Sequence, residues 1–369
     1  LLNLNTNKKT ANNNLTLDKR CYATFLDKEN HIRYFRMNDW IQGRLWSSVN
    51  PINSSLRKEL GSESAKLIIK LNQTKLDYKR DDFDWDLSNY LWIERYYKKF
   101  DIGRKRKNII KKLLENLKDN DSKYKRLRKR LIHNDLNDNN IIVSEDLKNP
   151  KILGFIDFGD CIKSQLINEL AITCTYGIIN SLNPLNSACD IVKGFNQEIP
   201  VTEIEIEFLY DLILIRISIS ILKSALNEKY NPENNYLQVS KNDMLSVFDK
   251  WSKIDRGLAI HFFRNACNFT PNVNEKKFNR LIRQNKSSID KLFGKNEIDK
   301  LQKLDLSVSS NWLSSDLIND IDLFEKKINQ NSSSTFFGGY SEIRAVYDSS
   351  DYERLTENGF ENRTTHMGL

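Results

Sequence analysis

The stretch that decides the fold runs from Leu131 to Asp160 and reads LIHNDLNDNNIIVSEDLKNPKILGFIDFGD. It contains His133, Asp135 and Asn140 in an H-x-D-x-x-x-x-N pattern, and Asp157 follows in the context Ile-Asp-Phe-Gly. Phosphoryl transfer uses this spacing, with one carboxylate near the substrate hydroxyl and then an amide and a second carboxylate that hold Mg²⁺. The pattern therefore predicts a proton acceptor at Asp135 and a metal site at Asn140 and Asp157.

Local structure is expected to bring the metal ligands together. Asn140–Val143 is predicted to be a short strand and Lys151–Ile156 its hairpin partner, because a turn-rich segment separates two apolar runs. Pairing these strands brings Asn140 close to Asp157. The alternative is a polar loop and hairpin that arose by chance. The joint pattern argues against chance, because apolar strands flank polar residues at fixed offsets.

The composition indicates a globular protein with a basic balance. Of 369 residues, 39% are hydrophobic and 29% are charged, and the net charge is +8. This length permits two domains and a sizeable core. Basic clusters lie at Arg104–Lys112 and Lys123–Arg130. We interpret them as solvated helix faces rather than a nucleic-acid site, although a basic surface also attracts an anionic nucleotide.

Cysteine usage and hydropathy favour a cytoplasmic protein without a nucleic-acid or membrane partner. The 5 cysteines include no C-x-x-C pair, which is typical of reduced thiols. The most apolar stretch, Phe208–Leu226, contains Asp211, Arg216 and Lys223, so it predicts a buried helix rather than a membrane span. The N-terminus has no apolar core segment of a signal peptide.

The remaining pattern predicts two N-terminal strands followed by helices. The strands are Tyr22–Leu26 and Ile32–Met37, joined by a turn at Asp27–Asn30. Thr202 and Glu205 form a capping box at the start of one helix. The predicted helices are Leu56–Gln73, Trp85–Phe100, Lys105–Asn120, Ser164–Asn180, Thr202–Glu228, Lys241–Ser252 and Arg256–Cys267.

Both ends of the sequence suggest an internal fragment of a longer polypeptide. The first residue is Leu, and the last residues, Thr364–Leu369, do not end an element. After Pro271 the composition shifts to a charged and then Ser- and Asn-rich stretch, which predicts a helical linker over residues 273–335. A new β-rich segment is expected over residues 336–369.

The catalytic run, with Glu169-Leu170-Ala171 behind it, resembles the aminoglycoside phosphotransferase and choline kinase superfamily. Within that superfamily the chain is most similar to the hydroxylysine-kinase type of amino-alcohol kinase. It is especially similar to the kinase domain that some bacterial proteins fuse to a class III aminotransferase. The resemblance covers about Tyr22–Pro271. Further matches are Trp85-Asp86-Leu87, Gly194-Phe195, Arg216 and Pro232-Glu233-Asn234-Asn235-Tyr236-Leu237.

The resemblance implies an α+β, protein-kinase-like fold, mostly the helical C-terminal lobe. Residues 1–39 would be a remnant of the N-terminal lobe and hinge, and residues 40–272 would be the phosphotransferase lobe. Residues 337–369 resemble the opening of a lysostaphin-type peptidase-like domain, with His366 in its first metal motif. Only one ligand of that motif is present, so we expect no zinc site in this chain.

The resemblance also implies roles for individual residues. Asp135 would be the catalytic base, His133 would brace the catalytic loop, and Asn140 and Asp157 would be the Mg²⁺ ligands. ATP or GTP would be the co-substrate. The hinge whose backbone meets the adenine or guanine would comprise Arg36, Met37, Asn38 and Asp39.

Three further positions keep two interpretations each. Glu169 matches an acidic position that packs beneath the catalytic loop, and a polar residue near a helix start is an equal alternative. Trp85 and Asp86 would face the substrate, or would be a core tryptophan and a helix cap.

One departure from the family concerns the nucleotide site. These kinases have a loop that covers the phosphates and a strand lysine that grips them, but residues 1–19 are too short for the strands and helix required. Lys8, Lys9 and Lys19 match no strand lysine. We therefore expect negligible turnover by this chain alone.

The leading functional prediction is a Mg²⁺-dependent phosphotransferase. It would move the γ-phosphoryl group of a nucleoside triphosphate to the hydroxyl of a small amino alcohol of hydroxylysine, ethanolamine or choline type. One alternative is a non-catalytic, kinase-like binding module within a multidomain aminotransferase. A third possibility, a role centred on the peptidase-like segment, lacks most of the residues it would need.

Overall fold

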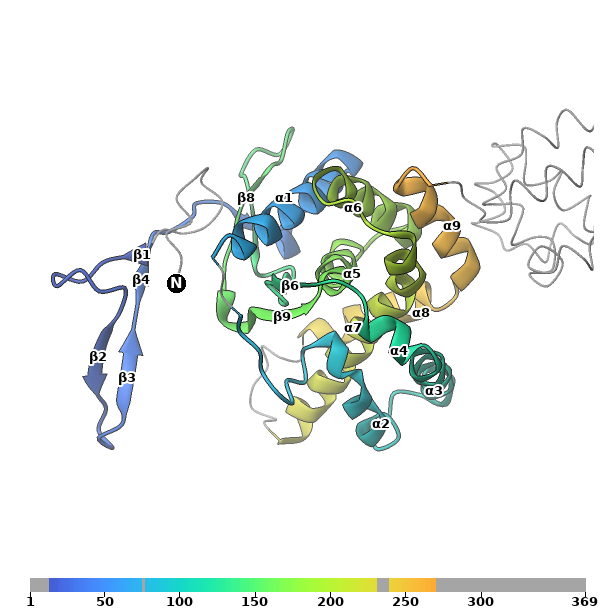
Figure 1. The fold of residues 1–369 in the computed structure, drawn as a ribbon, viewed down its shortest axis with the longest axis horizontal. Helices are drawn as coiled ribbons and strands as arrows, with labels where there is room; N and C mark the ends of the chain where they lie inside the picture. The colour runs from blue at the N-terminus through green and yellow to red at the C-terminus, as the bar shows by residue number, and fades with distance from the viewer. Residues whose placement is uncertain (1–12, 75–76, 231–238, 270–369) are drawn as a thin grey trace, which may run out of the picture. The chain divides into compact units, whose positions relative to one another are not determined.

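The computed structural model of the protein describes residues 13–74, 77–230 and 239–269 (Figure 1). Within these ranges, helices accompany small antiparallel sheets, and the predicted α+β class is confirmed. The chain divides into two compact units, Leu1–Lys253 and Ile254–Leu369. The described part of the second unit contains one helix, α9 (Arg256–Ala266). The predicted linker and peptidase-like segments lie outside the described residues.

The two predicted N-terminal strands form, but the second ends at Phe35 rather than Met37. Strand β2 (Ala23–Leu26) pairs with β3 (Ile32–Phe35), with Leu26 opposite Ile32. The Asp27 side chain closes the turn between them by accepting hydrogen bonds from the amides of Glu29 and His31, each at 2.9 Å. Strand β4 (Met37–Asn38) pairs separately with β1 (Asn13–Asn14).

Two small sheets frame the catalytic run. Strand β7 (Ile141–Val143) pairs with β8 (Ile152–Phe155), which confirms the predicted hairpin, and β5 (Arg44–Leu45) joins the other edge of β7. Strand β6 (Lys129–Ile132) pairs with β9 (Ile162–Gln165). Ser164 lies in β9, so the prediction that a helix begins there is wrong.

Helix α5 (Leu166–Gly177) lies at the centre of the helical body, with every residue buried (Figure 1). Helix α7 (Glu203–Tyr230) packs against it, and the Thr175 hydroxyl approaches the Ile213 carbonyl at 3.5 Å. The predicted capping box precedes α7: the Thr202 amide donates to Glu205 at 2.9 Å, and the Glu205 amide donates to Thr202 at 3.3 Å. No helix in the described ranges is both long and apolar enough to cross a bilayer.

Helices α1 (Ser54–Asn72) and α6 (Pro184–Glu198) cross at two glycines. A Cβ atom on Gly61 would lie 1.9 Å from the Ile191 carbonyl oxygen, and one on Gly194 would lie 1.8 Å from that of Lys58. Only residues without side chains permit this backbone approach. Helix α6 was not among the helices predicted from the pattern.

The predicted helix Trp85–Phe100 is wrong as a single element. A 3₁₀ segment, η2 (Leu87–Trp92), precedes a short α2 (Ile93–Tyr96), and Asn89 inside η2 has non-helical angles of φ −97° and ψ 24°. Other described helices follow the predicted positions within a few residues: α3 (Arg104–Asp119), α8 (Val239–Trp251) and α9. A short helix, α4 (Asp121–Lys125), follows α3.

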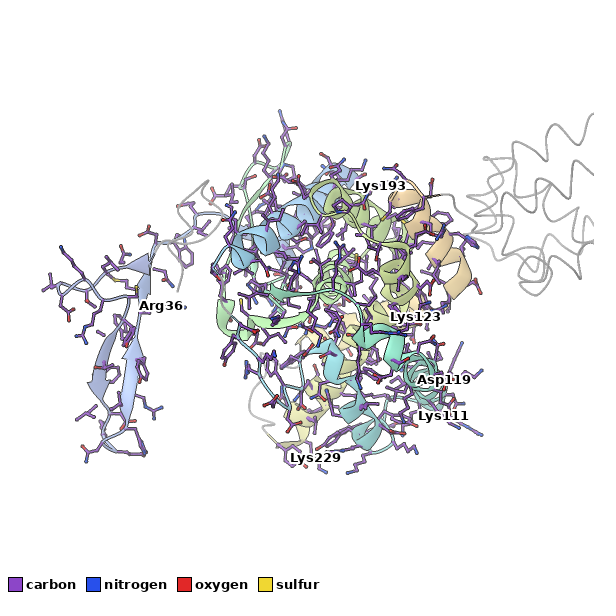
Figure 2. The ribbon with its side chains drawn as sticks, in the orientation of Figure 1. Arg36, Lys111, Asp119, Lys123, Lys193 and Lys229 are labelled. Carbon is purple, nitrogen blue, oxygen red and sulfur yellow. The ribbon has the colours of Figure 1, made fainter. Side chains whose placement is uncertain are left out.

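The first basic cluster lies on α3, whereas the second extends from α4 into strand β6. Helix α3 buries Ile110, Leu113, Leu114 and Leu117 along one face, while its lysines lie outside. Figure 2 labels Lys111 on α3 and Lys123 on α4. Lys111 pairs with Glu115 at 3.7 Å, and Lys123 contacts Glu207. The arrangement on α3 and α4 agrees with the interpretation as solvated helix faces, but that interpretation is wrong for Lys129 and Arg130, which are exposed on a strand.

Candidate active site

The loop from His133 to Asn140 connects β6 to β7 and carries the predicted catalytic residues. Asn72 of α1 holds its entry, because its Nδ2 donates to the Leu131 carbonyl at 2.9 Å and its Oδ1 accepts from the Leu131 amide at 3.0 Å. Strand β9, on the other side of β6, runs on into α5. The loop therefore starts from backbone that a helix and a strand both restrain.

His133 ties the start of the loop to the end of β8. Its Nε2 lies 3.0 Å from the Ile156 carbonyl oxygen, and its Nδ1 accepts from the Asp135 amide at 3.3 Å. The ring also packs on Phe158, with centroids 4.8 Å apart. Burial lowers the pKa of His133 to about 4. The imidazole is thus neutral at physiological pH, with Nε2 as donor and Nδ1 as acceptor, which suits the predicted bracing role.

A buried carboxyl group supports the loop from below. Glu169 of α5 is 0% exposed, and its Oε2 accepts from the Asn134 amide at 2.9 Å. Burial raises the pKa of Glu169 to about 7. Asn134 has a positive φ of 67°, a conformation that asparagine tolerates better than most residues. The contact favours the interpretation that Glu169 packs beneath the loop over a polar residue at a helix start.

Asp135 lies at the centre of a hydrogen-bond network. Its Oδ1 accepts from Nη2 of Arg216 at 2.8 Å, and its Oδ2 accepts from the side-chain amides of Asn137 and Asn140, each at 3.0 Å. The Asp135 side chain remains 21% exposed. Burial raises the pKa of Asp135, while the Arg216 guanidinium opposes the rise. The carboxylate is thus partly exposed yet fixed by three donors.

The β7–β8 hairpin places the two predicted metal ligands at one end, as expected. The Ile156 amide donates to the Asn140 carbonyl at 3.1 Å, and Asp157 follows directly. The Asn140 side chain donates through Nδ2 to the Asp135 backbone at 2.8 Å, which leaves its Oδ1 for a cation. Asp157 is exposed, with a left-handed backbone of φ 61°, and its carboxylate accepts from the Gly159 amide at 3.3 Å.

This donor set suits Mg²⁺. An amide oxygen and a carboxylate are hard oxygen ligands, and Mg²⁺ in kinases takes its other ligands from phosphate and water. Within the described ranges, no group of three or more His, Cys, Asp or Glu side chains could hold a metal by itself. A cation at Asn140 and Asp157 would therefore depend on the nucleotide for part of its coordination.

The structure distinguishes the environments of Asp86 and Trp85. Asp86 is 9% exposed and caps η2, accepting from the Ser88 amide at 2.9 Å and from the Ser164 hydroxyl at 2.7 Å. The helix-cap interpretation of Asp86 is therefore confirmed. Trp85 is half-buried, and its ring lies against the guanidinium of Arg216, 4.6 Å from the centroid.

The predicted hinge residues form a separate group. Arg36, Met37, Asn38 and Asp39 are all exposed. Met37 and Asn38 pair with β1, and the Asp39 carboxylate accepts from the Asn14 side chain at 3.0 Å. Their role toward a nucleotide base stays a prediction.

Sequence reasoning missed two contributions to the site. The sequence indicates Arg216 as a charge in a buried helix and as a family match, but it does not predict the ion pair with Asp135. Asp160, in a 3₁₀ turn after Asp157, pairs with Arg80 at 3.1 Å, and burial raises its pKa. A lone arginine in an apolar helix was the available signal for Arg216, since buried charges require partners.

Comparison with solved structures defines the class of fold. A microcompartment-associated aminopropanol kinase superposes with a TM-score of 0.50 at 14% identity, covering 71% of this chain and 78% of that chain. At this identity the likeness concerns the fold alone. The chain has a protein-kinase-like fold, as predicted.

Sequence comparison gives a more specific similarity. Residues 17–188 match the model of the phosphotransferase enzyme family. The hydroxylysine kinase of Mus musculus is 30% identical over 217 residues, covering 56% of this chain and 57% of the mouse protein. That of Xenopus laevis is 31% identical over 185 residues, covering 46% and 47%. The chain thus spans about half the length of the curated relatives it matches.

Proposed function

We propose that this chain is a phosphotransferase that moves the γ-phosphoryl group of ATP or GTP to the hydroxyl of a small amino alcohol. The observation that carries the proposal is the convergence of Asp135, Asn140 and Asp157 at one end of the β7–β8 hairpin. The match to the phosphotransferase family and the similarity to hydroxylysine kinases support it.

In this proposal Asp135 orients the substrate hydroxyl and accepts its proton. Its exposed fraction faces solvent, while its donors restrict the carboxylate to one orientation. Asn140 and Asp157 would hold Mg²⁺, which when bound neutralises charge on the transferring phosphoryl group. His133 holds the loop that carries Asp135. Most of the rate enhancement would come from positioning and charge stabilisation, because phosphoryl transfer needs little covalent chemistry from the protein.

The nucleotide would meet this site from the side of residues 36–39. Before Trp40, the described lysines are Lys19, at a bend, and Lys28, in a turn, so neither is a strand lysine. We therefore propose that residues 1–369 alone have negligible phosphotransferase turnover. A kinase-like binding module without catalysis is the second candidate. The lack of a strand lysine among the described residues before Trp40 favours it.

The test is a phosphotransfer assay with hydroxylysine, ethanolamine and choline, each with Mg-ATP and Mg-GTP. Residues 1–369 and the complete gene product should both be measured, with Asp135→Asn as the blank. Transfer that depends on Asp135 supports the kinase. Nucleotide binding without transfer in the complete gene product would favour the binding module. The peptidase-like segment and a class III aminotransferase in the same polypeptide stay predictions.

A further inference from the structure

Helix α7 contains a single arginine inside its most apolar part. Residues 212–221 read LILIRISISI, and the Arg216 side chain is 0% exposed. A buried guanidinium is costly unless charged and polar groups surround it. The contacts of Arg216 should therefore reveal why the charge is there.

Residues from three distant parts of the chain surround the guanidinium of Arg216. Trp85, before η2, and Tyr176, on α5, present their rings to it at 4.6 Å and 5.3 Å from the ring centroids. The third contact is Asp135, whose Oδ1 lies 2.8 Å from Nη2. Arginine is suited to this place because its planar group can stack on aromatic rings and bond a carboxylate at once.

The ion pair completes the restraint of the Asp135 carboxylate. Asn137 and Asn140 hold Oδ2, whereas Arg216 holds Oδ1. Without Arg216, the carboxylate could rotate about its bond to Cβ. A rotation of this kind moves the proton acceptor relative to a bound hydroxyl, and small displacements of a catalytic group strongly reduce rate.

We propose that Arg216 is the positioning residue that aims Asp135 at the substrate hydroxyl. Because the Arg216 side chain is 0% exposed, it would act on the reaction through Asp135 rather than by touching the substrate, and its Nη1 donates to the Trp85 carbonyl at 3.5 Å. Trp85 and Tyr176 hold its guanidinium in the required plane. This inference rests on the proposed phosphotransferase function.

The experiment is a double-mutant cycle in the complete gene product, with steady-state phosphotransfer to hydroxylysine. We expect Arg216→Met to lower kcat by about 10²-fold, with the KM for Mg-nucleotide nearly unchanged. In an Asp135→Asn background the same substitution should change kcat by less than about threefold, because the group on which Arg216 acts is gone. Arg216→Lys keeps the charge without the planar fork, so it should lose less rate than Arg216→Met.

Arg128→Met is the matched control. Arg128 pairs with Glu205, which is 1% exposed and lies at the start of α7, through bonds of 2.7 and 2.9 Å. Its loss should lower the unfolding temperature without changing kcat. Arg216→Lys replaces Arg216→Met in the cycle if the methionine variant does not fold.

Two results would overturn the role of Arg216 alone: a folded Arg216 variant with normal kcat, or losses that multiply in the Asp135→Asn background. A wild-type protein that transfers no phosphate to any amino alcohol would instead overturn the proposed function, and the role of Arg216 with it.

Discussion

At the scale of single residues, Asp135 and Asp157 have contrasting environments. Asp135 is held by Arg216 and two amides, and burial raises its pKa. Asp157 is exposed and held only by the Gly159 amide in the described structure. A restrained carboxylate suits proton acceptance from a fixed hydroxyl, whereas an exposed one beside Asn140 suits a cation that arrives with its nucleotide.

Asp135→Asn should separate chemistry from binding. The substitution preserves shape but removes the proton acceptor, and general-base contributions are typically about 10²–10⁴-fold in rate. We expect kcat of the complete gene product to fall by that order, with little change in the affinity for Mg-nucleotide. Steady-state kinetics with titrated Mg²⁺ provide the measurement. A near-normal kcat would remove Asp135 as the base and favour the binding module.

Asp157→Asn should weaken Mg-nucleotide binding as well as rate, because a charged ligand is lost from the proposed metal site. Calorimetric titration of Mg-ATP and Mg-GTP measures the effect. Asp146→Asn is the matched control, since Asp146 is an exposed carboxylate in the turn of the same hairpin, where it accepts from the Lys148 amide at 2.8 Å. Equal losses of affinity in both variants would contradict the assignment of Asp157.

Glu169 predicts a pH dependence of stability. Burial raises its pKa from 4.5 to about 7 in the folded protein. Between these values the folded state binds more protons than the unfolded state, so this group's stabilisation falls as pH rises from about 4.5 to 7. Glu169→Gln does not titrate. The free energy of unfolding of the wild type relative to Glu169→Gln should therefore fall by up to about 3 kcal/mol across that window.

Denaturant unfolding of both proteins at several pH values between 4.5 and 8 measures this difference. The opposing contribution of His133, whose pKa is lowered to about 4, makes stability rise with pH from about 4 to 6.5. It is present in both proteins and largely cancels. A stability difference that does not vary with pH would show that Glu169 stays ionised in the folded state.

At the scale of elements, the crossing of α1 and α6 depends on Gly61 and Gly194. Gly194→Ala places a methyl group where a Cβ would lie 1.8 Å from the Lys58 carbonyl oxygen, so the helices must move apart. Overpacking of this kind typically costs about 1–3 kcal/mol of stability. Thermal unfolding should show a lower midpoint, whereas Lys193→Ala, at the exposed neighbouring position, should not. Equal midpoints for the two variants would mean that the crossing adapts freely.

The same scale separates local from distant determinants of secondary structure. The β7–β8 hairpin was predictable because its strands and turn are contiguous. The start of α7 was predictable because Thr202 and Glu205 form a capping box. The pairing of β6 with β9 was not, because Ser164 has no local signal that distinguishes a strand end from a helix start. The predicted helix Trp85–Phe100 is interrupted at Asn89, and Asp86 before it caps η2 and bonds Ser164 of β9, a partner distant in the sequence.

At the scale of the whole molecule, a prediction concerns the nucleotide site, because neither described lysine before Trp40 lies in a strand. We predict that residues 1–369 alone transfer phosphate much more slowly than a protein with a strand lysine and phosphate-covering loop, because these groups supply much of the positioning in kinases. Parallel assays of residues 1–369 and the complete gene product test this. Robust transfer by residues 1–369 would mean that their N-terminal part already completes the nucleotide site.

The sequence by itself determined which residues are candidates for the base and the metal ligands, and that Asn140 and Asp157 lie at one end of a hairpin. It could do so because His133, Asp135, Asn140 and Asp157 lie on one contiguous loop and hairpin, where spacing alone dictates proximity. Only the tertiary structure decided how these residues are held. Arg216 reaches Asp135 from α7, and Glu169 reaches the catalytic loop from α5. The partner of a buried charge depends on how the helices pack, and spacing along the chain does not encode that packing.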